Sequence, residues 1–172
     1  MGCNCLVASR EVAGCNESFK IDVLDRLDQD RIIGEGLRAK KLKQLSNYDL
    51  YNLVEKMNLP LNDIIRKDEG ENITKIGFYI INLDDCKGPG THWTSLYYNP
   101  LQSIYFDSFG FMAPLEIEEA IRPYIYNDND IQDFDSSACG NYVNAFIKFL
   151  HNKNDKYEAY LQFLGLFKNK NN

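Results

Sequence analysis

The sequence predicts a single α+β domain in which a central mixed β-sheet is flanked by helices. Three apolar runs of strand length, at residues 75–83, 91–98 and 103–106, lie close together in the middle of the chain and are rich in β-branched and aromatic side chains. Helical patterns precede and follow them, at residues 49–57 and 131–150. A length of 172 residues is enough for one hydrophobic core that needs no disulfide or metal to hold it together.

The first quarter of the chain has the weakest pattern. Residues 1–18 show no hydrophobic period, and residues 21–45 alternate charged and aliphatic side chains, with two glycines that divide them into two short helices. We therefore divide the chain into an N-terminal extension, residues 1–44, to which we assign no role, and a domain over residues 45–172.

The domain begins with a predicted helix. Ser46 precedes the helical pattern of residues 49–57 in the manner of an N-cap residue, and a proline shortly after the pattern ends it. A short apolar patch at residues 61–65 and a charged loop at residues 66–72 should then lead into the first strand.

The next two strands, residues 91–98 and 103–106, are separated by a short turn, which predicts an antiparallel pair. His92 lies at the start of the first strand and Asp107 directly follows the second. The pairing should therefore bring these two side chains to the same end of the sheet. The remaining predicted elements are a helix at 114–121 with a proline at its start, a strand at 124–126, the helix within 131–150 and a helix at 157–167.

The helix within residues 131–150 contains a candidate nucleophile, Cys139. The apolar residues that recur on one face of this helix are Val143, Phe146, Ile147 and Leu150. Ser136 and Ser137 are the expected N-cap residues, so Cys139 should lie near the helix N-terminus. There the free N–H groups and the helix dipole favour a thiolate. The alternative is a buried cysteine that only packs against neighbouring side chains.

Nucleophilic catalysis by a thiol needs a base, and a third group that fixes the tautomer of that base. His92 is the candidate base, because the other histidine, His151, ends the predicted helix and has the position of a C-terminal charge. Asp107 is the candidate orienting group. Gln132 lies seven residues before Cys139 and is a neutral amide donor of the kind used in oxyanion holes.

In this order, the four residues closely resemble the catalytic residues of the adenovirus-type (adenain-like) and Ulp-type cysteine proteases. That clan includes the maturation proteases of large DNA viruses, virophages and related elements. Its histidine belongs to a His-Trp pair at the start of a strand, which matches His92 and Trp93 in GTHWTSLYYN. Its acidic residue follows the next strand, which matches Asp107 in YFDSFGF. A glutamine upstream of the nucleophile matches Gln132, and the Ser-x-Cys-Gly context of the nucleophile matches Cys139 in SACG.

The resemblance covers residues 45–150 and implies an adenain/Ulp-like fold and peptide-bond hydrolysis that uses no cofactor and no metal. Trp93 and Gly140 would contact the substrate, although Trp93 could instead serve only to pack the core. The aspartate at position 107 matches the Ulp-type branch, whereas the adenovirus enzyme has glutamate there. Phe109 with the glycine after it, and the sequence SSACG, favour the adenovirus-type branch.

As a viral maturation protease, the protein would process capsid or core precursor proteins next to small residues, glycine above all. We expect a monomer in the host-cell cytoplasm and in the virion. The N-terminus has no secretory signal, and no apolar run approaches the ~18 residues of a membrane span. The five cysteines form no disulfide framework, and those at positions 3, 5 and 15 make a poor zinc site. A net charge of −6 does not favour activation by nucleic acid.

Three other functions stay open. A deconjugase of the same clan would cut after the C-terminus of a ubiquitin-like protein. Some clan members are acetyltransferases, which would use the same thiol for acyl transfer. A non-catalytic binding module could keep the fold, although the four filled catalytic positions argue against it.

Overall fold

The computed structural model describes residues 44–84, 92–132 and 137–167. The two helices predicted before residue 44, the N-cap position Ser136 and the candidate zinc ligands lie outside the described residues.

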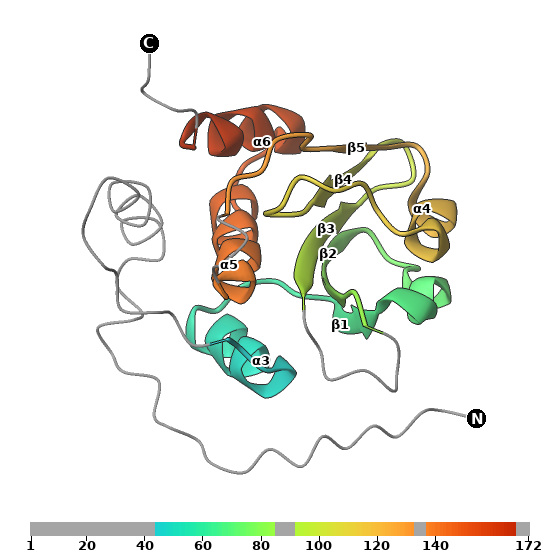
Figure 1. Ribbon diagram of the computed structural model, residues 1–172. Helices are drawn as coiled ribbons and strands as arrows, with labels where there is room; N and C mark the ends of the chain where they lie inside the picture. The colour runs from blue at the N-terminus through green and yellow to red at the C-terminus, as the bar shows by residue number, and fades with distance from the viewer. Residues whose placement is uncertain (1–43, 85–91, 133–136, 168–172) are drawn as a thin grey trace.

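A five-stranded mixed sheet forms the centre of the molecule (Figure 1). Its strands follow one another in space in their sequence order, and the outer pairs are parallel while the two inner pairs are antiparallel. The strands are β1 (Asp63–Arg66), β2 (Gly77–Asn82), β3 (Trp93–Tyr98), β4 (Ser103–Phe106) and β5 (Tyr124–Tyr126). The predicted α+β class with a mixed sheet is therefore confirmed.

Helices cover both faces of this sheet. One face packs against three helices, α3 (Asn47–Lys56), α5 (Cys139–Leu150) and α6 (Lys156–Gly165), and together they enclose the larger hydrophobic core. The other face packs against α4 (Leu115–Ile121), with the 3₁₀ helix η1 (Lys67–Asn72) beside it, around a smaller core. Figure 1 shows α4 and α5 on opposite sides of the strands.

The helix α5 is the most deeply buried element. Every residue in it except Lys148 and Phe149 is buried, including the four apolar residues predicted to face the core. Phe146 stacks on Phe106 of β4 with ring centroids 5.3 Å apart, and it meets Phe163 of α6 edge-on at 5.9 Å. Because aromatic contacts of this kind add to the free energy of burial, α5 is held firmly against the sheet.

The helix α3 begins after the N-cap residue that the sequence predicts. Ser46 is the N-cap: its hydroxyl accepts a hydrogen bond from the Asp49 N–H, and the Asp49 carboxylate accepts one from the Ser46 N–H. This reciprocal pair satisfies two of the backbone donors that a helix N-terminus leaves free.

Three local predictions were wrong. The apolar patch at residues 61–65 and the loop after it form β1 and η1, because pairing with β2 supplies backbone partners that the local pattern does not reveal. The N-cap of α5 is Ala138, not Ser137, and Ala138 contributes no side-chain cap. Cys139 is consequently the first residue of the helix. Its backbone N–H is one of the first four, which have no acceptor within the helix itself.

Replacing Phe146 by alanine should lower the free energy of unfolding by about 3–5 kcal/mol, because a fully buried aromatic ring leaves a cavity among rings that cannot collapse into it. Chemical denaturation with urea, followed by circular dichroism, measures this change. The matched control is Leu101→Ala at an 84% exposed position, for which we expect a change within about 0.5 kcal/mol. Equal losses for the two variants would contradict the assignment of α5 as the centre of the core.

Candidate active site

His92 and Asp107 meet at one end of the sheet. The register of β3 and β4, with Ser95 opposite Phe106, places the residue before β3 close to the residue after β4. His92 Nε2 lies 2.8 Å from the Oδ1 atom of Asp107, as the predicted hairpin requires. The Asp107 side chain is fully buried, and the His92 side chain is 13% exposed. A histidine with one edge on a buried carboxylate and a small exposed area is suited to proton transfer.

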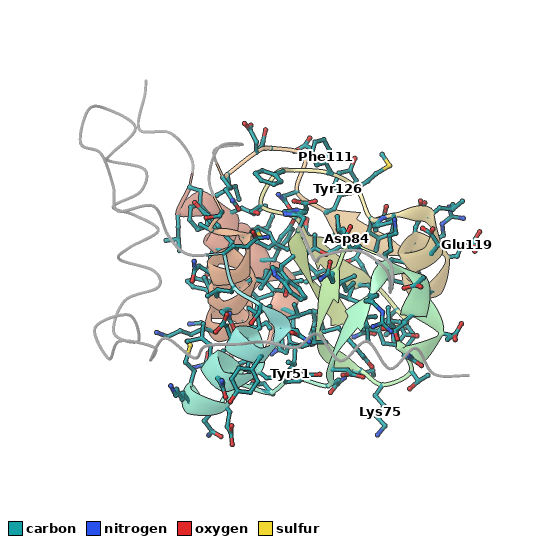
Figure 2. The ribbon with its side chains drawn as sticks, turned by 60° about the horizontal axis from the view of Figure 1, so that its bottom comes forward. Tyr51, Lys75, Asp84, Phe111, Glu119 and Tyr126 are labelled. Carbon is teal, nitrogen blue, oxygen red and sulfur yellow. The ribbon has the colours of Figure 1, made fainter. Side chains whose placement is uncertain are left out.

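The same end of the sheet collects the segments that follow β2, β4 and β5 and the segment that precedes β3. Leu83, just after β2, donates its N–H to the carbonyl oxygen of His92 at 3.0 Å. Figure 2 shows Asp84, Phe111 and Tyr126 toward this end of the molecule, and Lys75, which precedes β2, at the other. The candidate site therefore lies where several loops converge.

The backbone of Asp107 is held by Asn127, a buried residue that directly follows β5. The Asn127 side-chain oxygen accepts a hydrogen bond from the Asp107 N–H at 3.1 Å, and its Nδ2 donates to the Asp107 carbonyl oxygen. The sequence pattern gave no sign of this role. The parallel pairing of β4 with β5 places Asn127 beside Asp107, and no local sequence pattern predicts that pairing.

Phe109 holds the two members of the pair together. Its backbone N–H donates to Asp107 Oδ1 at 2.8 Å, and its ring stacks on the His92 imidazole with centroids 4.6 Å apart. The turn that places Phe109 there ends at Gly110, whose φ of +78° favours glycine. The stacked ring restricts rotation of the imidazole, which helps to keep Nε2 on the carboxylate.

Cys139 lies next to the imidazole of His92. The residue is 3% exposed at the start of α5, and its thiol is close enough to the ring to help raise the pKa of His92. Among the described residues Nδ1 has no hydrogen bond of regular geometry. Cys139 and His92 are therefore neighbours without a hydrogen bond between them in this structure, an arrangement that does not exclude a pair that aligns when a substrate binds.

The environment of His92 favours its protonated form. Burial of the imidazole lowers its pKa, but the interactions with Asp107 and Cys139 and the negative charges of both groups outweigh burial. Together they raise the pKa of His92 from 6.5 to about 9. At neutral pH the ring would then carry a proton and could stabilise a thiolate beside it.

Gln132 is connected to this group through Ser108. Its side-chain oxygen accepts a hydrogen bond from the Ser108 hydroxyl at 2.7 Å, and both side chains are buried. The N–H groups of Gln132 and Ile131 also donate to the Ser108 carbonyl oxygen, at 2.9 and 2.8 Å. Because Ser108 follows Asp107 directly in the chain, the predicted amide donor is anchored to the loop that carries the carboxylate.

Trp93 and Gly140 both pack around Leu45. The Trp93 indole is 3% exposed and donates its N–H to the Leu45 carbonyl oxygen at 2.8 Å. A Cβ atom on Gly140 would lie only 3.0 Å from the Cβ of Leu45, so a larger residue at position 140 would fit only if Leu45 shifted by a few tenths of an ångström. These contacts favour the packing alternative for Trp93. The substrate contacts of both residues stay a prediction.

Within the described ranges, no group of three or more His, Cys, Asp or Glu side chains could hold a metal ion. In the same part of the chain every helix is too short or too polar to cross a membrane. No protein-family model matches the sequence, and no curated protein matches it. The geometry and the chemistry of the residues therefore carry the functional argument.

An NMR titration of the His92 imidazole should give a pKa of about 9, and a lower value in the Cys139→Ala variant, which loses the interaction with the sulfur. The folded-state pKa lies above the ordinary 6.5, so protonation of His92 stabilises the fold. This stabilisation should be complete below pH 6.5 and lost as the pH rises through about 9. An identical pKa in the two proteins would show that the thiol does not contact the imidazole.

Proposed function

We propose that the protein is a cysteine endopeptidase with an adenain/Ulp-like fold, and that it processes viral capsid or core precursor proteins in the host-cell cytoplasm and in the virion. The observation that carries the proposal is the imidazole of His92, whose Nε2 is hydrogen-bonded to the Asp107 carboxylate and which has Cys139 as a neighbour. A thiol, a base and a group that orients the base are the minimum that nucleophilic catalysis needs.

The first half of the reaction forms an acyl-enzyme. Cys139 and His92 react as a thiolate and an imidazolium, and the thiolate attacks the scissile carbonyl carbon. The tetrahedral oxyanion accepts hydrogen bonds from the Gln132 side-chain amide and from the backbone N–H of Cys139. When the intermediate collapses, the C–N bond breaks, His92 protonates the leaving amine, and a thioester remains on Cys139.

The second half uses the same groups in reverse. His92, now neutral, takes a proton from a water molecule that attacks the thioester carbonyl carbon. The second oxyanion collapses, the C–S bond breaks, and the carboxylic acid product leaves. His92 returns its proton to the sulfur, or keeps it beside the thiolate. Throughout both halves Asp107 fixes the ring and stabilises the imidazolium.

The alternative of a cysteine that only packs the helix explains less. Cys139 does belong to the larger hydrophobic core, but it also lies beside an imidazole that is bound to a fully buried carboxylate, which packing alone does not require. Burying a carboxylate costs several kcal/mol unless it is paired and hydrogen-bonded. Strongly shifted titratable groups beside a potential nucleophile are typical of catalytic sites.

Of the residues in the site, Cys139 should be indispensable. In an assay with fluorogenic octapeptides that contain glycine next to the cut, Cys139→Ala should abolish turnover while circular dichroism shows an unchanged fold. Cys15→Ala is the matched control, because it removes another thiol and should leave the rate unchanged. Retained turnover in Cys139→Ala would remove Cys139 from the mechanism.

The same assay separates the maturation protease from the deconjugase. A maturation protease reads a short extended segment, so the peptides should be cut efficiently. A deconjugase draws binding energy from a folded ubiquitin-like surface remote from the scissile bond, so truncation to a peptide would cost it most of kcat/KM. Much faster cleavage of a ubiquitin-like fusion than of every peptide would identify a deconjugase.

The pH dependence should differ between hydrolysis and alkylation. The kcat/KM for the peptides should fall as the pH rises through about 9, because His92 loses the proton that the leaving amine requires. Alkylation of Cys139 by iodoacetamide needs only the thiolate, so its rate should not fall over the same range. A hydrolysis rate that keeps rising above pH 9 would contradict the role of His92 as the acid.

A further inference from the structure

We propose that the Ser108 hydroxyl is a positioning residue that sets the orientation of the Gln132 amide, so that its N–H donors face the oxyanion. This inference rests on the proposed function. It assigns a role to a residue that touches neither the thiol nor the imidazole in the described contacts.

The first step of the argument is the contact itself. The Ser108 hydroxyl donates to Gln132 Oε1 at 2.7 Å, in a place where Ser108 is 1% and Gln132 is 2% exposed. Water therefore has little access to replace the serine hydroxyl. A buried hydrogen bond of normal length restricts the side chain that accepts it.

The second step concerns the amide group. A glutamine side chain presents one acceptor and one two-hydrogen donor on opposite arms of the same plane, and rotation by half a turn exchanges them. A hydroxyl that donates to Oε1 makes one of the two orientations more stable. In the other orientation the amide oxygen would occupy the position of the donors and would repel a developing oxyanion instead of stabilising it.

The third step concerns the support of Ser108. Its carbonyl oxygen accepts the N–H groups of Ile131 and Gln132, so it holds the backbone of the glutamine as well as its side chain. Ser108 is bonded directly to Asp107, whose backbone is held by Asn127. One short segment after β4 thus positions both the carboxylate that orients the base and the amide that binds the oxyanion.

The kinetic test is a double-mutant cycle on peptide hydrolysis. Gln132→Ala should lower kcat by about 10²–10³ with little change in KM, as is typical when one oxyanion donor is lost. Ser108→Ala should also lower kcat, by no more than that factor, again with KM little changed. In the Gln132→Ala background it should cause no further loss, since residues that act through one group are not additive.

The chain offers a matched control for Ser108→Ala. Ser95 in β3 is a buried serine like Ser108, but among the described residues its hydroxyl has no hydrogen-bond partner. Ser95→Ala should leave kcat unchanged. In Ser108→Ala, alkylation of Cys139 by iodoacetamide should keep its wild-type rate, because that reaction forms no oxyanion. A loss of alkylation equal to the loss of hydrolysis would indicate general damage to the site and overturn the proposal.

A second measurement does not depend on turnover. In ¹⁵N-labelled protein, the side-chain NH₂ signals of Gln132, assigned by their loss in Gln132→Ala, should be resolved and slow to exchange with solvent. They should shift and exchange faster in Ser108→Ala but not in Ser95→Ala. Unchanged signals in Ser108→Ala, or an additive loss of kcat in the double variant, would overturn the positioning role. Wild-type protein that cuts no peptide and no fusion would refute the protease, while these signals still decide whether Ser108 orients the amide.

Discussion

The hydrogen bond between His92 Nε2 and Asp107 Oδ1 is the interaction on which the rest of the site depends. It places a carboxylate in a position with no exposed surface, which is costly unless neighbouring donors compensate. The imidazole and the N–H of Phe109 supply two donors to Oδ1, but among the described residues Oδ2 has no hydrogen-bond partner. A buried carboxylate with one unpaired oxygen is unusual in a folded protein, and such groups are more common at functional sites.

Two parts of the fold must be correctly positioned relative to each other for Cys139 to lie near that imidazole. The hairpin of β3 and β4 places the base, and α5 delivers the thiol from a segment far along the chain. Because α5 is buried on nearly all sides, its position is determined by packing, above all by Phe146. The close approach of Leu45 to Gly140 adds a constraint at the end of the helix that begins with Cys139. The site is therefore a consequence of the larger core.

Several residues of the site were beyond sequence reasoning, and the reason is the same for each. Asn127, Ser108 and Phe109 act by holding another functional residue, through contacts that depend on strand pairing or on the path of a loop. A motif shows the groups that perform chemistry, because chemistry restricts their residue types. It does not show the residues that position them, because many side chains can supply one hydrogen bond or one flat surface.

By itself, the sequence determined the class of the fold, most of its helices and strands, and the placement of His92 and Asp107 at one end of the sheet. Hydrophobic periodicity and turn residues involve only a few neighbouring positions, so helices, strands and turns can be predicted from the local sequence. Only the tertiary structure decided that residues 63–66 form a strand, that α5 begins at Cys139 without a side-chain cap, that Cys139 lies near His92, and that Gln132 bonds to Ser108. These outcomes depend on burial and on pairing between segments distant in the chain, whose free energies no local pattern contains.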